Sequence, residues 1–114
     1  MNYELQKKLL ASYPKIYRNK PVFLIGDGWF DLVNELSDKI EKMLDNLMDE
    51  DFSCFQVSEK HGNLSFSMWK TTDKMLKVIE DAEDKSSRIC EESGCKGKLT
   101  KKMGCRQTLC ENCY

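Results

Sequence analysis

Histidine is nearly absent from this chain, since His61 is the only one among 114 residues. Nucleophilic catalysis by cysteine usually needs a neighbouring base, and no motif links His61 to Cys54 or Cys105. The turn at residues 26–28 (Gly-Asp-Gly) also lacks the further glycine and the lysine of a phosphate-binding loop. We therefore expect no enzymatic activity and assign no catalytic residue.

Long apolar runs and an excess of charge are missing too. No apolar stretch approaches the roughly 20 residues that span a bilayer, and the N-terminal residues have no apolar core resembling a signal peptide. The net charge is only −1, so the chain as a whole has no electrostatic preference for nucleic acid. We expect a cytoplasmic protein whose electrostatic preferences are local.

Apolar residues recur at helical spacing in two long segments, which predicts two long helices. The first covers about residues 28–48. The second begins at Thr71 or Thr72 and runs up to Cys90. A short helix is expected over residues 2–13, where a proline ends it.

The remaining apolar segments favour extended structure. Residues 22–25 are an apolar run that forms either a buried strand or an extended plug. Alternating apolar residues between 52 and 69, interrupted by a turn at residues 59–63, predict a β-hairpin. The expected fold class is α+β, with a helical and hairpin body at residues 1–89 and a zinc-binding module at residues 90–114 packed on it.

Four of the six cysteines form two close pairs near the end of the chain, Cys90 with Cys95 and Cys110 with Cys113. In a reducing compartment such pairs favour metal ligation over disulfides. Each pair would form a tight turn, and the segment between them would fold back to bring four thiolates around one zinc ion. Cys105 is an alternative to one of these ligands, and a disulfide or free thiols are the other alternative.

The C-terminal module has little apolar material of its own. Its only large aliphatic side chains are Leu99, Met103 and Leu109, which cannot bury enough surface to keep the segment ordered. A structural zinc ion contributes on the order of 10 kcal/mol in small peptides. Four protein thiolates leave no open position for water, so the expected zinc ribbon is structural.

Acidic residues concentrate in residues 27–51, which contain nine acids and two bases. Asp27 is the expected N-cap of the first long helix. The apolar stripe must face the core, so the acidic side chains of this helix point outward. They either pair with bases of the same chain or present an acidic surface to a basic partner. The candidate partner-binding residues are Asp31, Glu35, Asp38 and Asp45.

Three short motifs carry a resemblance to a known group of proteins. They lie at residues 26–32 (Gly-Asp-Gly-Trp-Phe-Asp-Leu), 57–66 (Val-Ser-Glu-Lys-His-Gly-Asn-Leu-Ser-Phe) and 90–113 (the cysteine segment). Together they resemble a family of small phage and prophage zinc-binding proteins, and the chain is similar to the zinc-containing anti-CRISPR inhibitors of the type II RNA-guided DNA nuclease. In that family a cysteine often stands at the position of Ser93 and an aromatic residue at that of Cys105. Cys95 is then the natural substitute for the missing cysteine.

The resemblance implies a function without chemistry. Such a protein would act in the host bacterial cytosol by binding a CRISPR effector nuclease directly, which would block target DNA loading or activation. The near-zero net charge argues against mimicry of DNA by the whole body. The alternative is a phage protein that binds nucleic acid or regulates transcription through its zinc ribbon.

Overall fold

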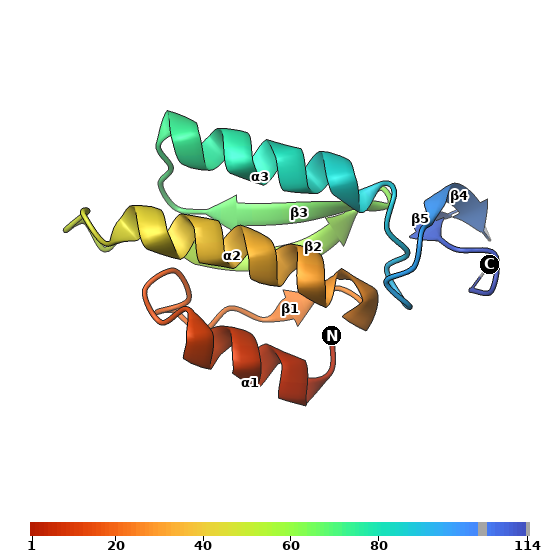
Figure 1. Cartoon of the computed structure of the whole chain (residues 1–114), viewed down its shortest axis with the longest axis horizontal. Coiled ribbons are helices and arrows are strands. Elements are labelled where there is room, and N and C mark those ends of the chain that lie inside the picture. The colour runs from red at the N-terminus through yellow and green to blue at the C-terminus, as the bar shows by residue number, and fades with distance from the viewer. Residues whose placement is uncertain (103–104, 114) are drawn as a thin grey trace.

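The structure, a computed structural model, describes residues 1–102 and 105–113, and for residues 101, 102 and 105 it describes the backbone alone. Over these residues three α-helices and two small β-sheets confirm the α+β class (Figure 1). In chain order the elements are α1 (Tyr3–Ser12), β1 (Phe23–Leu24), η1 (Asp27–Trp29), α2 (Phe30–Leu44), β2 (Cys54–Lys60), β3 (Asn63–Met68), α3 (Asp73–Ser86), β4 (Lys98–Lys102) and β5 (Cys105–Leu109).

The larger sheet has the strand order β1-β2-β3. The apolar run at residues 22–25 contains a strand, and Phe23 pairs in parallel with Val57 of β2. On the other side of β2, Val57 lies opposite Phe66 of the antiparallel strand β3. Phe23, Val57 and Phe66 are all buried, so one row of side chains across the three strands faces the core.

The turn between β2 and β3 has two residues, His61 and Gly62, with φ angles of 55° and 89°. Two consecutive left-handed residues are typical of the type I′ turn, which matches the twist of a hairpin. Glycine adopts this conformation without strain. The side chain of Glu59 accepts a hydrogen bond from the Gly62 N–H at 2.7 Å and further stabilises the turn.

The first long helix begins with a single 3-10 turn and is shorter than predicted, since α2 ends at Leu44. Its buried side chains follow the predicted helical stripe, and they are Leu32, Val33, Leu36, Ser37, Ile40 and Leu44. The predicted N-cap role of Asp27 is wrong, because Trp29 holds that position with no side-chain cap. The carboxylate of Asp27 instead accepts hydrogen bonds from the backbone and side chain of Asn2, at 2.7 and 3.1 Å.

Helix α3 begins at the predicted cap, because the Thr72 hydroxyl accepts a hydrogen bond from the backbone N–H of Met75 at 3.2 Å. It lies along the outer edge of β3. Two backbone N–H groups of that edge, from Leu64 and Phe66, donate to the side chains of Ser86 and Glu83 at 2.8 and 2.9 Å. Helix α3 therefore occupies donors that an exposed sheet edge would offer to another strand.

The β4 and β5 hairpin lies beyond one end of the body, next to the N-terminal end of α2 and the C-terminal end of α3 (Figure 1). The described molecule measures 44 × 29 × 21 Å along its principal axes. Among the described residues, we find no helix with the length and apolar content that crossing a membrane requires.

Candidate metal centre

Three cysteine thiols meet where the hairpin joins the body. The sulfur atoms of Cys90, Cys110 and Cys113 all lie within 4.8 Å of one another. Cys90 is fully buried, Cys110 is 9% exposed and Cys113 is intermediate. All three are free thiols. Converging soft thiol ligands suit a thiophilic ion such as zinc, so this cluster can hold a metal ion.

Two similar turns present these thiols. In the first, which we call knuckle 1 (residues 90–94), the Gly94 N–H donates to the Cys90 carbonyl at 2.9 Å. In the second, knuckle 2 (residues 110–113), the Cys113 N–H donates to the Cys110 carbonyl at 3.1 Å. Each knuckle begins with a cysteine that carries one thiol of the cluster. Knuckle 2 supplies a second thiol after two intervening residues, and at that place knuckle 1 has Ser93.

The Ser93 side chain faces the thiols. Its hydroxyl lies 3.4 Å from the sulfur of Cys110, and its backbone N–H donates to the sulfur of Cys90, also at 3.4 Å. Both contacts lie on the side of the turn that faces the cluster. A hydroxyl group therefore lies at the edge of the thiol cluster, in contact with Cys110.

Cys95, which the spacing predicts as a ligand, is outside the cluster and its side chain is exposed. The reason is the turn at Gly94, whose φ of 79° closes knuckle 1 one residue earlier. The Cys95 backbone packs against the knuckle, because its N–H lies 3.4 Å from the Ser93 hydroxyl and its carbonyl accepts from the Cys90 N–H at 2.7 Å. Three of the four predicted ligands are thus brought together.

Cys105, the alternative ligand, begins β5 and pairs with Lys102 at the far end of the hairpin. Leu109 ends the same strand next to the cluster, so about 14 Å of strand separates the two backbone positions at about 3.4 Å per residue. The side chain of Cys105 lies outside the described residues. The backbone position alone argues against its sharing the site.

Hydrogen bonds within the cluster shift the pKa values of its thiols in opposite directions. Burial raises the pKa of the Cys90 thiol, but hydrogen bonds from Ser93 and from neighbouring backbone groups outweigh it and lower the pKa to about 6. Hydrogen bonds with Cys110 and Cys90 raise the pKa of Cys113 to about 11. A divalent ion would stabilise the thiolate form of each cysteine that coordinates it.

The body fixes knuckle 1 through the 26–29 motif (Gly-Asp-Gly-Trp). The Gly28 N–H donates to the Glu91 carbonyl at 2.7 Å, and the Gly26 N–H donates to the Glu91 carboxylate at 2.9 Å. The buried Trp29 ring donates its N–H to the Ile89 carbonyl at 2.8 Å. A Cβ on Gly28 would overlap the Cys90 carbonyl oxygen and the Gly94 nitrogen, so only glycine allows this approach.

The hairpin turn of the larger sheet fixes the other side of the module. The buried hydroxyl of Thr108, just before Leu109 in β5, donates to the Gly62 carbonyl at 2.7 Å. A Cβ on Gly62 would meet the side chain of Leu99 in β4. The sequence motifs at residues 26–32 and 57–66 therefore meet the cysteine segment in space.

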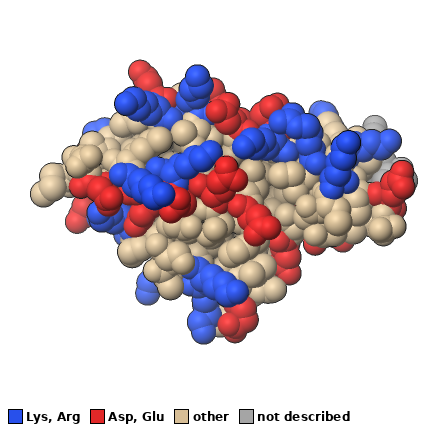
Figure 2. All heavy atoms as spheres, viewed as in Figure 1, with Lys and Arg blue, Asp and Glu red and all other residues tan. Residues whose placement is uncertain are grey.

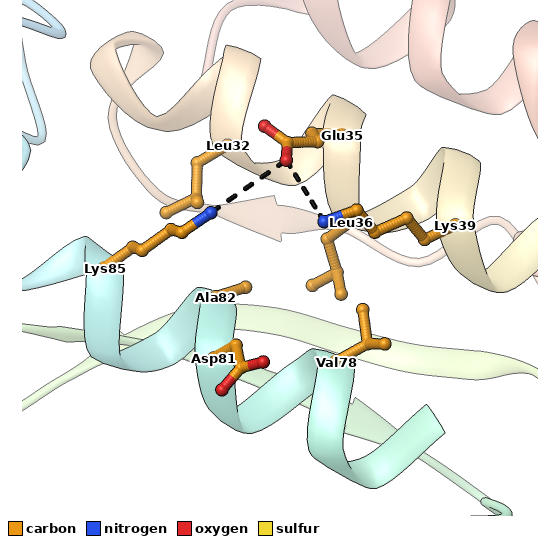
Figure 3. Close-up of a pocket in the computed structure, with 8 residues that line it drawn as sticks. All are labelled: Leu32, Glu35, Leu36, Lys39, Val78, Asp81, Ala82 and Lys85. Carbon is orange, nitrogen blue, oxygen red and sulfur yellow. Dashed lines mark ion pairs between the residues drawn. The ribbon is translucent and has the colours of Figure 1, made fainter. Parts of the chain in front are cut away.

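The predicted partner-binding residues on α2 are exposed or half-buried, and some are paired with lysines of the same chain. Glu35 lies 3.2 Å from Lys39 and 4.0 Å from Lys85 of α3, above a small cavity between the two helices (Figure 3). Asp38 lies 3.0 Å from Lys42. Internal pairing, the first of the two expectations for this helix, therefore applies to Glu35 and Asp38.

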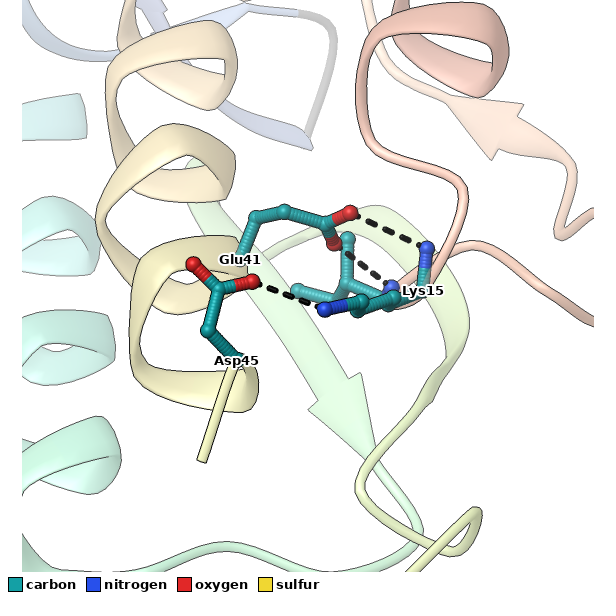
Figure 4. Close-up of polar contacts among 4 residues, drawn as sticks. Lys15, Glu41 and Asp45 are labelled. Atoms are coloured by element: carbon teal, nitrogen blue, oxygen red, sulfur yellow. Dashed lines mark hydrogen bonds and ion pairs between the residues drawn. The ribbon is translucent and has the colours of Figure 1, made fainter. Parts of the chain in front are cut away.

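The end of α2 holds the loop after α1. Asp45 forms an ion pair with Lys15 at 2.7 Å, and Glu41 accepts hydrogen bonds from the backbone N–H groups of Lys15 and Ile16 at 3.1 and 2.9 Å (Figure 4). Sequence reasoning did not single out Glu41. Its signal is the helical spacing that places it one turn before Asp45.

Asp31 is exposed in the first turn of α2. Within the part of the chain that the structure describes, no basic group lies within ion-pair distance of it. Acidic and basic side chains alternate over the face formed by α2 and α3 (Figure 2). This face is mixed in charge, and Asp31 is the least compensated of the four predicted contact residues.

No protein-family model matches the chain, and neither a curated protein nor a solved structure is significantly similar to it.

Proposed function

We propose that the chain is a small, non-enzymatic protein-binding module whose C-terminal hairpin is stabilised by one structural zinc ion. The observation that carries this proposal is the convergence of the Cys90, Cys110 and Cys113 thiols at the junction with the body. Zinc ligated mainly by thiolates contributes folding energy and needs no catalytic partner. Bound there, it would tie knuckle 1 to knuckle 2.

The proposed partner is a CRISPR effector nuclease of type II, and the proposed effect is inhibition by direct binding. The resemblance of the three sequence motifs to zinc-containing anti-CRISPR proteins supports this partner. The proposed contact surface is the outer side of α2, through Asp31, Glu35, Asp38 and Asp45. The exposed ion pairs of Glu35, Asp38 and Asp45 contribute little to stability, so these carboxylates can exchange their own lysines for cations of a partner.

The test is inhibition of guided DNA cleavage by the purified, metal-loaded protein. The proposal predicts that cleavage falls as the protein is titrated against the nuclease and its guide, and that the two proteins co-elute from a sizing column. Unaffected cleavage without co-elution, for a panel of type II nucleases, contradicts the partner. Zinc binding would remain a separate result.

A second candidate function is binding of nucleic acid by the hairpin. Exposed basic side chains on and beside the two strands favour it, namely Lys96, Lys98 and Arg106. Phosphate contacts would make the affinity fall steeply with salt. A titration against a DNA duplex at two salt concentrations separates this candidate from protein binding, since a protein-only binder shows no saturable affinity at either.

A further inference from the structure

Cys90 and Ser93 have the same spacing in the sequence as Cys110 and Cys113, but the two pairs differ in chemistry. Knuckle 2 begins and ends with a thiol, whereas knuckle 1 begins with Cys90 and has the Ser93 hydroxyl at the matching place. That hydroxyl is 3.4 Å from the Cys110 sulfur, and the backbone N–H of the same serine donates to the Cys90 sulfur at 3.4 Å. An ion that binds the three thiols in a tetrahedral arrangement has one position left.

We propose that Ser93, and not Cys95, fills the fourth position of the metal centre, so that the ion has three thiolate ligands and one weak, exchangeable oxygen ligand. This inference rests on the proposed zinc site. The three thiols would each lose a proton on binding the ion, while the serine coordinates as a neutral alcohol. The centre then carries one negative charge less than a site with four thiolates.

The geometry of Cys95 supports this assignment. Its backbone is committed to knuckle 1 by the hydrogen bond from the Cys90 N–H to its carbonyl at 2.7 Å. Its own N–H approaches the Ser93 hydroxyl at 3.4 Å, and its side chain is exposed. To enter the cluster, the Cys95 thiol would have to replace Ser93 and break this turn.

The exchangeable position opens to solvent. Cys90 is fully buried and Cys110 nearly so, but Ser93 is exposed. An alcohol oxygen is a weaker ligand for zinc than a thiolate. A small nitrogen or sulfur donor from solution, such as imidazole or a low-molecular-weight thiol, can therefore compete for this place. The site would bind structural zinc and still accept one external ligand.

Cobalt substitution in the full chain tests the ligand count. Cobalt in place of zinc gives sulfur-to-metal absorption that grows with the number of thiolates. S93C should raise this absorption by about one third, because four thiolates replace three. C95S and C105S should leave the spectrum unchanged. Loss of absorption in C95S or C105S would overturn the assignment, and so would an unchanged spectrum in S93C.

Affinity and exchange provide the second readout. In competition with a chelator, S93C should hold zinc about tenfold more tightly or better, and S93A should hold it less tightly than the parent. Imidazole should shift the cobalt spectrum of the parent but not that of S93C. A parent spectrum that does not respond to imidazole, or an S93A affinity equal to that of the parent, contradicts an exchangeable serine ligand. A parent that binds neither metal refutes the proposed zinc site itself, which is a different outcome.

Discussion

The backbone N–H of Gly28 donates to the carbonyl of Glu91 at 2.7 Å, and this hydrogen bond joins two segments that lie 63 residues apart in the chain. The N–H of Glu91 in turn donates to the Thr108 carbonyl at 2.9 Å. A single residue therefore links the start of the first long helix to the C-terminal hairpin. The position of the thiol cluster depends on this link, because Cys90 immediately precedes Glu91.

Adding a methyl group at Gly28 should displace knuckle 1 and with it the Cys90 thiol. The new Cβ would overlap the Cys90 carbonyl, so we expect G28A to destabilise the protein by about 2–3 kcal/mol and to weaken zinc binding. Chemical denaturation and a chelator competition measure the two effects. The matched control is D27A, which changes the same motif without adding a side chain against the knuckle and should leave zinc affinity unchanged. Equal zinc affinities in G28A and the parent would disprove the link.

The hydrogen bond from the Thr108 hydroxyl to the Gly62 carbonyl should stabilise the folded protein. T108V keeps the shape of the side chain but leaves the Gly62 carbonyl without this donor, so stability should fall by about 1–2 kcal/mol. Zinc content should be retained, since no ligand changes. The control is T100V, whose hydroxyl donates to Gln107 within the hairpin at a partly exposed site. If T100V costs as much stability as T108V, the contact with the body has no special role.

Glu83 should make stability depend on pH. Burial raises its pKa above the ordinary 4.5, against the lowering effect of the hydrogen bond from the Phe66 N–H. A carboxyl with a raised folded-state pKa binds its proton more tightly in the folded protein, so stability falls as pH rises above the unfolded pKa. E83Q, whose amide oxygen still accepts from Phe66, should be more stable than the parent at pH 7.

The advantage of E83Q should vanish at pH values well below 4.5, because the Glu83 carboxyl is then protonated in the folded and in the unfolded protein alike. Melting temperatures of E83Q and the parent between acid and neutral pH measure this difference. D81N, at an exposed position on the same helix and not among the groups that shift the pKa of Glu83, is the control and should show no such trend. If the melting temperatures of E83Q and the parent differ by the same amount at every pH, the predicted effect of burial is contradicted.

The outer side of α2 can be tested by charge reversal. D31K/D38K should fold and bind zinc like the parent, because both side chains are on the solvent-facing side, but should inhibit guided cleavage less well. D73K/E80K makes two charge reversals at the same spacing on α3, including one in the first helical turn, and should inhibit normally. Equal inhibition by both variants would show that α2 is not the contact surface.

Much of the fold follows from the sequence because its patterns are local. The apolar stripe of α2 is regular enough to predict the helix, but Leu47 and Met48 continue the stripe after the helix has ended at Leu44. The run at residues 22–25 could not be assigned, since the strand partner that decides it, Val57, lies more than 30 residues away. Long-range pairing of this kind has no signal in a single sequence.

The sequence predicts only part of the thiol cluster. Cys90, Cys110 and Cys113 follow from residue type and spacing, but a search for cysteines alone passes over Ser93. The available signal is that Cys90 and Ser93 have the same spacing as Cys110 and Cys113. The 26–29 motif has the local pattern of a turn with a helix cap. Its contact with Glu91 depends on the tertiary fold, so the local pattern does not predict that contact.

Metal content of the full chain tests the central claim most directly. Elemental analysis of the purified protein should find about one zinc ion per chain, and C110S should lower both this content and the melting temperature. C54S is the matched control, because Cys54 is buried in β2 away from the cluster, and it should retain the zinc. A metal-free parent protein, or a C110S variant with unchanged zinc content and an unchanged melting temperature, would contradict the account.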